Sequence, residues 1–228
     1  MAIDPKLLEE LESRRNKIKY AASPEKYEAR HAKGDWTARE RMSCLFDAGS
    51  FTEIGMHTKH HCSNFGMLNK DIPGDGIVTG FGLVNGRPVA ATAADFLAQG
   101  GSLGYMHAQK ICDAQQYALK AGMPIIQIND SGGARLQEGI ESLTGFANVF
   151  YNNVAASGVV PQISLILGPC AGGAAYSPAL TDFIIIRRGG AAGMYITGPK
   201  VIEQVTYEKC AMEEIGGADV HSSVSGNA

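Results

Sequence analysis

The sequence predicts an α/β protein, and two observations lead to this fold class. Short apolar segments rich in β-branched residues are each followed by a glycine-rich turn and then by a segment with helical periodicity. This order occurs three times, beginning at segments 124–128, 163–167 and 192–196. Short, continuous apolar strands that alternate with helices are typical of a largely parallel sheet that is buried on both faces.

Residues 1–46 form the first predicted unit, a charged helical segment. Four apolar residues recur there at helical spacing and form one stripe: Leu7, Leu8, Leu11 and Ile18. A second, short helix is expected to begin at 37–40, because Thr37 followed three residues later by Glu40 matches a capping box. The remaining residues, 47–228, are predicted to form one α/β domain.

The elements of that domain are predicted from turn and capping signals. Strands are expected at 75–84 and 87–94, because Asn85-Gly86 between them is a strong signal for a two-residue hairpin turn. A long helix is expected at 104–121, since Gly122 and Pro124 follow it. The other expected elements are strands at 124–128, 163–167, 183–186 and 192–196, and helices at 137–157 and from Lys200.

Charge, hydropathy and cysteine content exclude several classes of protein. Lys plus Arg number 20 and Asp plus Glu number 23, so the net charge of -3 predicts no nucleic-acid binding. The most apolar segment, 159–176, is interrupted by prolines and glycines, so no membrane span is expected. The five cysteines form no C-x-x-C pair, and the N-terminus lacks an apolar signal segment. We therefore expect a protein of the cytoplasm, or of the equivalent mitochondrial matrix, that is not secreted.

Glycine-rich turns are the main candidate functional feature. The chain has 28 glycines among 228 residues, well above the usual share of about 7%. Gly132-Gly133 and Gly172-Gly173 each follow a predicted core strand, and Gly100-Gly101 forms a third glycine loop. Glycine lets a ligand approach main-chain N–H groups, and free N–H groups at a helix start bind phosphates or oxyanions. The alternative is that these turns serve packing alone.

Other catalytic chemistries find little support in the sequence. There is no G-x-G-x-x-G fingerprint or G-K-[ST] motif, and Ser131 lacks the first glycine of a G-x-S-x-G elbow. The cluster His57, His60, His61 and Cys62 matches no standard metal spacing, so we expect a solvated loop and no metal. Asp130 and Glu138 flank the first glycine turn, and we expect them to cap or anchor it rather than act as an acid–base pair.

Six longer motifs are spread over most of the chain, at residues 37–41, 100–104, 130–139, 168–179, 181–184 and 196–199. Together they resemble a known family, the biotin-dependent carboxyltransferases that act on acyl-CoA. The motifs are most similar to those of propionyl-CoA carboxylase β chains, methylmalonyl-CoA decarboxylase α chains and large transcarboxylase subunits. The resemblance implies the crotonase-like ββα superhelix, preceded by the N-terminal helical segment. It covers an N-terminal half, so 47–228 is expected to be an acyl-CoA carboxyltransferase N-terminal domain with an incomplete C-terminal end.

The resemblance also implies a mechanism and site residues. In the family, carboxybiotin releases CO2, the biotin ureido anion takes the α-proton of the acyl-CoA, and the thioester enolate attacks CO2. The implied catalytic groups are the backbone N–H groups of a thioester oxyanion hole: Gly132, Gly133, Ala134, Gly172 and Gly173. The implied CoA contacts are Gly100, Gly101, Ser102, Arg135, Ala171, Arg39 and Arg41, with Arg135 favoured as a loop anchor.

The implied partners are a short-chain acyl-CoA (propionyl, acetyl, methylmalonyl or malonyl), a C-terminal carboxyltransferase half or subunit, and a biotin carboxyl carrier protein. A homo- or hetero-oligomer is expected, with the biotin-side oxyanion hole in the second half. Two alternatives remain. A stand-alone crotonase-like hydratase, isomerase or decarboxylase would need a catalytic carboxylate, for which Asp182 or Glu138 are the candidates. A non-catalytic scaffold subunit would need none.

Overall fold

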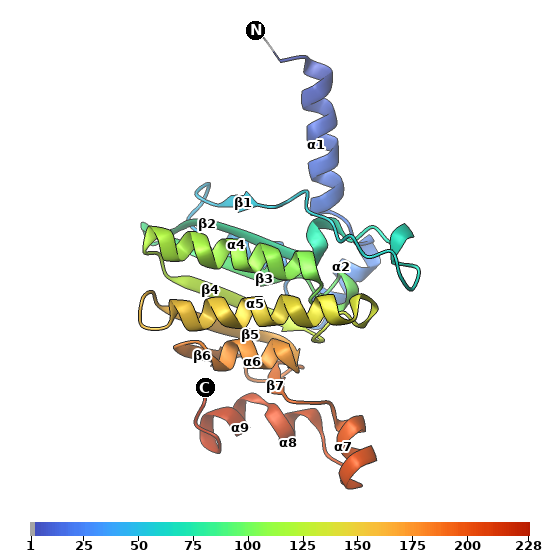
Figure 1. Ribbon diagram of the computed structural model, residues 1–228, viewed down its shortest axis with the longest axis vertical. Helices are drawn as coiled ribbons and strands as arrows, with labels where there is room; N and C mark the ends of the chain where they lie inside the picture. Colours follow the sequence, from blue (N-terminus) through green and yellow to red (C-terminus); the bar gives the residue numbers. More distant parts are fainter. Residues whose placement is uncertain (1–2) are drawn as a thin grey trace.

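A seven-stranded mixed sheet forms the centre of the computed structural model, which describes residues 3–228 (Figure 1). The strand order is β1-β2-β3-β4-β5-β6, and β7 pairs with β5. Strands β1 to β3 are antiparallel, whereas β3 to β6 and the β5–β7 pair are parallel. The strands are β1 Thr52–Ile54, β2 Ile77–Val84, β3 Arg87–Ala94, β4 Ile125–Ser131, β5 Gln162–Ala171, β6 Phe183–Ile186 and β7 Gly193–Tyr195.

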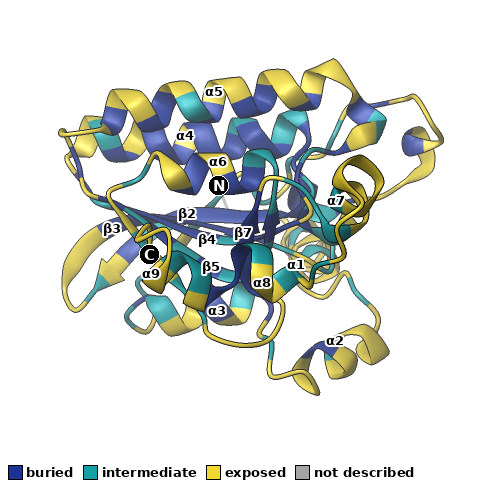
Figure 2. Cartoon of the chain, turned by 90° about the horizontal axis from the view of Figure 1, so that it is seen from below, coloured by how far each residue is buried: buried dark blue, intermediate teal, exposed yellow. Residues whose placement is uncertain are grey.

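Helices cover both faces of this sheet (Figure 2). On one face α4 (Tyr105–Ala121) and α5 (Ile140–Ala156) lie side by side, and on the other face lies α3 (Ala38–Leu45). The remaining helices are α1 Pro5–Lys19, α2 Pro24–His31, α6 Gly173–Ala179, α7 Pro199–Thr206, α8 Met212–Gly216 and α9 Ala218–Ser223. The predicted α/β class is therefore confirmed, together with the N-terminal helical segment.

Three local signals in the sequence act as predicted. The Thr37 hydroxyl accepts the Glu40 N–H at 3.2 Å, and a Glu40 carboxylate oxygen accepts the Thr37 N–H at 2.7 Å, which completes the capping box of α3. Asn85 and Gly86 both have positive φ, 50° and 76°, as a hairpin turn of this type requires. Gly122 takes the left-handed conformation that ends α4.

Several predicted boundaries are wrong, for two physical reasons. The helix expected at 137–157 is divided: a short 3₁₀ turn at Leu136–Glu138 stops at Gly139 (φ 55°, ψ -127°), and α5 begins at Ile140. The strands expected at 124–128 and 163–167 continue to Ser131 and Ala171, because the two strands keep pairing up to Ser131–Cys170. Residues 168–171, expected to be a turn, are therefore part of a strand. Helix α2 was not anticipated.

The N-terminal segment is tied to the core through α3. Ala38, Met42 and Phe46 pack with Val89 and Ile126 in the cluster beneath the sheet. The division at residue 46 therefore stays a prediction, and residues 1–2 of the predicted unit lie outside the described residues. By contrast, no side chain of α1 is buried, and this helix projects from the body (Figure 1).

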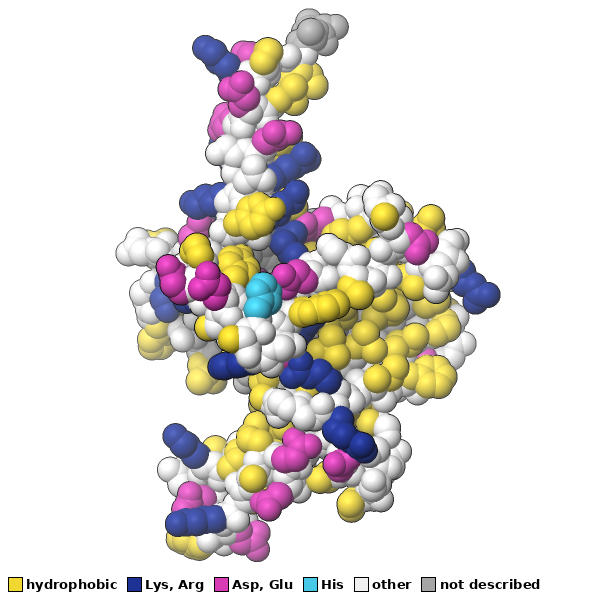
Figure 3. Space-filling model, turned by 180° about the vertical axis from the view of Figure 1, so that it is seen from behind, with side chains coloured by type: hydrophobic (Ala, Val, Ile, Leu, Met, Phe, Trp, Pro, Cys, Tyr) yellow, Lys and Arg dark blue, Asp and Glu magenta, His cyan; other side chains and the backbone are white. Residues whose placement is uncertain are grey.

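Hydrophobic side chains gather on the surface opposite α4 and α5 (Figure 3). Ile163 and Leu165 on β5 pack against the cluster beneath α3, and their partners on β6, Phe183 and Ile185, lie on the same side of the sheet. Phe183 and Ile185 are 62% and 57% exposed. The α3 face of the sheet is thus covered over β2 and β3 but open at β6. Among the described residues no helix is long and apolar enough to cross a membrane.

Candidate functional site

The three predicted glycine loops meet at one edge of the sheet, where the parallel strands β3, β4 and β5 end. The Gly132 N–H donates to the Gly100 carbonyl at 2.9 Å, and the Leu103 N–H donates to the Gly133 carbonyl at 2.9 Å. A Cβ on Gly133 would lie 2.8 Å from the Ala171 carbonyl oxygen, so the turns after β4 and β5 are in direct contact. The structure therefore brings together the predicted loops 100–102, 132–134 and 171–173.

Close packing explains why glycine occupies two of these positions. Gly101 has φ +65°, and a Cβ there would lie 2.1 Å from the Asp130 carbonyl oxygen. Gly133 has φ +99°, a conformation that residues with a side chain rarely adopt. Gly132 differs from both, because its φ is not positive and the nearest atom to a Cβ would be 3.6 Å away.

The hydrogen bonds decide which N–H groups of the turns are available to a ligand. The Gly132 and Gly172 N–H groups are used, the latter by the Tyr195 carbonyl at 2.9 Å, and the Gly133 N–H donates to the Ser131 hydroxyl at 3.2 Å. In the two turns after β4 and β5, the N–H groups of Ala134, Gly173 and Ala174 have no acceptor within residues 3–228. Of these, Ala174 was not predicted.

The two turns differ in their relation to helices. Gly172 and Gly173 are the N-cap and first residue of α6. Gly132-Gly133 does not adjoin a helix start, because α5 begins only at Ile140. The 132–135 segment instead lies against the segment before α4, with the Arg135 N–H donating to the Leu103 carbonyl at 2.9 Å. The first turn is held by neighbouring loops rather than by its own helix.

Arg135 lies beneath these loops with only 1% of its surface exposed. Its guanidinium donates to the Ser102 carbonyl at 3.0 Å, to Glu138 at 2.8 Å and to the carboxylate of Asp75. The other Glu138 oxygen accepts the Tyr105 N–H at the start of α4, at 2.7 Å. These contacts give Arg135 the geometry of a loop anchor. Asp75 was missed as a site residue in the sequence, where it was expected to begin the strand at 75–84; the structure places it in a 3₁₀ turn, Pro73–Gly76, before β2.

Asp130 anchors the end of β4 from the opposite side. Its buried carboxylate forms ion pairs with Arg30 and, at 2.9 Å, with Arg41. A Cβ on Gly168 of β5 would overlap this carboxylate, so Asp130 lies directly against the neighbouring strand. Arg41 is 4% exposed at its side chain and enclosed by these contacts. Asp130 is therefore engaged as an anchor.

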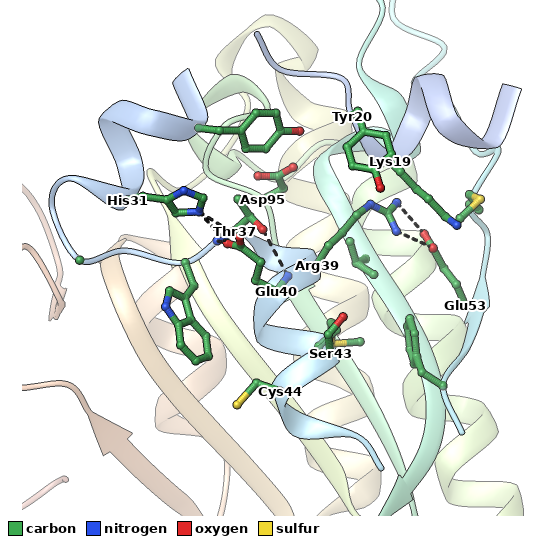
Figure 4. A pocket seen from close by; sticks show the side chains of 17 residues that line it. Lys19, Tyr20, His31, Thr37, Arg39, Glu40, Ser43, Cys44, Glu53 and Asp95 are labelled. Carbon is green, nitrogen blue, oxygen red and sulfur yellow. Dashed lines mark hydrogen bonds and ion pairs between the residues drawn. The ribbon is translucent and has the colours of Figure 1, made fainter. Parts of the chain in front are cut away.

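A cavity of about 1140 Å³ lies between the N-terminal helices and strands β1 and β2 (Figure 4). Arg39 extends into it from α3 and forms a bidentate ion pair with Glu53, at 2.7 and 3.1 Å. Its side chain keeps 26% exposure. The cavity is also lined by Lys19 at the end of α1, the next residue Tyr20, Trp36, and Asp95 after β3. Its volume is slightly above the range of roughly 300–1,000 Å³ that is typical of small-molecule and cofactor pockets.

Burial shifts the pKa values of three groups behind the glycine loops. Burial raises the pKa of Asp75, against the lowering influence of the Arg135 charge. Burial also lowers the pKa of Lys110 to about 8 and holds that of His107 well below 6.5. The neutral His107 ring faces the Asp75 carbonyl through Nδ1 at 2.9 Å, so Nδ1 carries the proton.

The other predicted side chains lie away from the glycine turns or are already paired. The Asp182 carboxylate accepts the Gln162 N–H at the beginning of β5, whereas the Gly172 turn follows the end of this ten-residue strand. His60 contacts the Lys70 carbonyl at 2.8 Å and His61 contacts Glu141 at 3.3 Å. Within the described part of the chain, no three His, Cys, Asp or Glu residues are grouped as a metal site.

Comparison with known proteins gives consistent similarities. Residues 29–228 match the model of the carboxyl transferase domain. The chain is 51% identical over 228 residues to methylmalonyl-CoA decarboxylase subunit alpha of Veillonella parvula, covering 100% of this chain and 45% of that protein. It is 50% identical over 222 residues to the mitochondrial propionyl-CoA carboxylase beta chain of Homo sapiens, covering 96% of this chain and 41% of the relative.

Among solved structures, the chain is similar to transcarboxylase 12S, a hexamer crystallised with methylmalonyl-coenzyme A, with a TM-score of 0.95 and 47% identity. The match covers 100% of this chain and 44% of that one. The predicted crotonase-like fold is thereby confirmed. The chain spans a little under half the length of these relatives.

Proposed function

Because the chain belongs to the carboxyl transferase domain family, we propose that it forms the acyl-CoA-binding half of a biotin-dependent carboxyltransferase. The reaction moves a carboxyl group between carboxybiotin and the α-carbon of a short-chain acyl-CoA. Propionyl-CoA or acetyl-CoA and the corresponding methylmalonyl-CoA or malonyl-CoA are the proposed substrates. The enzyme would be a carboxylase or a decarboxylase component, active together with its other half.

The observation that carries this proposal is the pair of free N–H groups on adjacent turns. Ala134 follows β4 and Gly173 follows β5, two neighbouring parallel strands, and neither N–H has an acceptor within residues 3–228. Two such donors can stabilise the negative oxygen of a thioester enolate. Losing one donor of this kind typically costs about 2.7–4 kcal/mol in the reaction barrier. Gly132, Gly133 and Gly172 would then shape the turns.

The side chains near these donors support a base that comes from outside the chain. Glu138 is bound by Arg135 and the Tyr105 N–H, and Asp130 by two arginines, so neither carboxylate is free to take an α-proton. Carboxybiotin supplies both CO2 and the base when it is bound. This chain would hold the thioester and exclude competing groups, and the oxyanion hole for biotin would come from the other half.

We assign the CoA contacts to the loops beside the donors and to the large cavity. Gly100, Gly101, Ser102 and Ala171 would line the channel to the thioester site. Arg39 is retained as a phosphate contact, because it reaches the cavity, whereas the enclosed Arg41 and Arg135 are assigned as anchors.

The proposed partners are a C-terminal carboxyltransferase half or subunit, a biotin carboxyl carrier protein, and further copies in an oligomer. The exposed apolar residues of β6 support a partner that covers them, because large apolar patches mark interaction surfaces. The five free thiols suit the cytoplasm or the mitochondrial matrix.

The test compares this chain alone with its mixture with a C-terminal half. Propionyl-CoA binding and decarboxylation of methylmalonyl-CoA or malonyl-CoA are measured with and without free biotin. We expect CoA binding by the chain and biotin-dependent turnover only in the mixture. Biotin-independent turnover by the chain alone would instead identify a stand-alone enzyme, and an absence of CoA binding would identify a scaffold.

A stand-alone hydratase, isomerase or decarboxylase is the weaker candidate. It would need a free carboxylate beside the second glycine turn. Asp182 lies at the opposite end of β5, about 30 Å away for a strand of ten residues. Glu138 is held in its ion pair with Arg135.

A further inference from the structure

We propose that Asp75 is a positioning residue that sets the orientation of the 132–135 turn, through Arg135. The inference rests on the proposed function, because it concerns the turn that would hold the thioester oxygen. Asp75 is 60 residues away from Arg135 in the sequence and belongs to none of the three glycine loops. It touches no substrate in this role and acts only by fixing its neighbours.

The contacts of Asp75 reach the 132–135 turn and α4 directly, and the loop before α4 through Arg135. One carboxylate oxygen accepts Arg135, and the other accepts the His107 N–H of α4 at 2.7 Å. The Asp75 carbonyl accepts the ring N–H of His107 at 2.9 Å. Arg135 in turn donates to the Ser102 carbonyl in the 100–102 loop. It also pairs with Glu138, whose other oxygen accepts the N–H of Tyr105, the first residue of α4. A shift of Asp75 would therefore move the turn, the loop and the helix together.

The backbone beside the free donor depends directly on Arg135. Arg135 follows Ala134, and its N–H donates to the Leu103 carbonyl and to the Ser142 hydroxyl at 3.1 Å. The Ser142 hydroxyl donates to the same Leu103 carbonyl at 2.6 Å. With its guanidinium and its N–H both fixed, Arg135 leaves the Ala134 N–H little freedom of direction.

Four buried ionised side chains around the turn carry two negative and two positive charges. Removal of one charge therefore leaves an opposite charge uncompensated. Asp75 and Glu138 are negative, and Arg135 and Lys110 are positive. Lys110 donates to the carbonyls of Gly74 and Ile77, on both sides of Asp75, at 2.8 and 2.5 Å. Breaking one partner of a buried ion pair is more disruptive than its surface equivalent, because the remaining charge is left in a poorly solvated site.

The unusual backbone of Asp75 adds a second reason for its identity. Its φ is +50°, in the left-handed region that favours glycine, asparagine and aspartate, and its side chain is fully buried. Asp75→Asn can keep this backbone and the shape of the side chain. The amide can still accept the His107 N–H with its oxygen, but it then presents N–H groups to the Arg135 guanidinium, which accepts nothing.

The experiment compares Asp75→Asn with Asp71→Asn in the same loop. Asp71 is a matched control, because its carboxylate is 40% exposed and pairs only with the surface residues Lys17 and Lys59. Amide hydrogen exchange of 132–135 is measured first, since it reports on the turn without any assumption about function. We expect Asp75→Asn to accelerate exchange there at least tenfold, and Asp71→Asn to leave it unchanged. Equal exchange in both variants would overturn the inference.

Ligand binding then tests whether the turn is aligned for a thioester. The affinities of propionyl-CoA and of free CoA, which lacks the carbonyl, are compared for each protein. The wild-type chain should prefer propionyl-CoA by about fivefold, the factor that one neutral hydrogen bond contributes. Asp75→Asn should lose this preference and shift the infrared carbonyl stretch of bound [1-¹³C]propionyl-CoA back toward its value in solution. Its affinity for free CoA should also fall, because the Ser102 loop shares the Arg135 anchor, but by a smaller factor than its affinity for propionyl-CoA.

The outcomes separate the inference from the proposed function. If the wild-type chain binds neither ligand, the proposed function fails, and with it the role of the turn. If it prefers propionyl-CoA and Asp75→Asn keeps both the preference and the carbonyl shift, the positioning role alone is wrong. If Asp75→Asn does not fold, Glu138→Gln is used instead. This variant removes the negative charge that pairs with Arg135 and keeps an oxygen that accepts the Tyr105 N–H. It should reduce the preference partially.

Discussion

The contact between the two glycine turns leads to a quantitative prediction for Gly133→Ala. The φ of +99° at Gly133 is strained for alanine, and its Cβ would lie 2.8 Å from the Ala171 carbonyl oxygen, which belongs to the backbone of a paired strand. Backbone strain of this kind costs about 1–3 kcal/mol. With the close contact, we expect a loss of about 3 kcal/mol in the free energy of unfolding. For a chain of this size that corresponds to a fall of about 6–12 °C in Tm.

Two matched glycine-to-alanine variants separate the causes. Gly132→Ala, next in the chain, should change the stability by less than about 0.5 kcal/mol, because its φ is not positive and its surroundings are open. Gly158→Ala has a φ of +72° but open space, so it should show the backbone cost alone, about 1 kcal/mol. Urea unfolding and thermal melts are followed by circular dichroism. If Gly133→Ala is no less stable than Gly158→Ala, the rigid contact between the turns does not exist.

Three further predictions concern buried charges and thiols. Lys110 has a lowered pKa of about 8 against an ordinary 10.5, so at this group the unfolded chain binds more protons between these pH values and its contribution to stability should rise with pH. The buried thiols of Cys112 and Cys170, whose pKa burial raises, act in the opposite direction above pH 9, so the Lys110 contribution, up to about 3 kcal/mol, is measured as the difference between wild type and Lys110→Met in urea melts from pH 7.5 to 10.5. Asp130→Ala leaves Arg30 and Arg41 buried without their carboxylate and should cost about 3–5 kcal/mol in urea unfolding, far more than the surface change Asp71→Ala. Cys44 is exposed and should react with a thiol reagent at pH 8 within minutes, whereas Cys170, whose pKa burial raises, should react only after unfolding; early labelling of Cys170 would contradict its enclosure.

Local signals predicted the parts of the fold that depend on neighbouring residues. The hairpin at Asn85-Gly86, the capping box at Thr37 and the end of α4 at Gly122 each need only a few adjacent residues, and all three are present. The ends of β4 and β5 were not predictable in this way. Pro169 and the glycines around it indicate a turn locally, yet pairing with two neighbouring strands keeps this stretch extended.

The site shows the same division between local and long-range information. The glycine pairs marked the turns, because glycine next to a strand end is visible in the sequence. The sequence does not reveal which N–H groups are free, because this depends on acceptors far away in the chain. The Gly172 N–H, for example, donates to the Tyr195 carbonyl. Asp75 was missed for a related reason: its partner Arg135 is far away in the sequence, and Asp75 was taken as the first residue of the strand expected at 75–84.

The pairing of β4 with β5 has a consequence for how such a site can change over time. Ala134 and Gly173 each follow one of two adjacent strands, whose separation is set by backbone hydrogen bonds at about 4.8 Å. No side chain determines the spacing of the two strand ends, so it stays nearly constant whatever residues surround the site, and only the orientation of the 132–135 turn depends on side chains such as Arg135. Under the proposed function, residues around the rim can diversify, and with them the acyl group accepted, while the spacing of the two strand ends is inherited from the sheet.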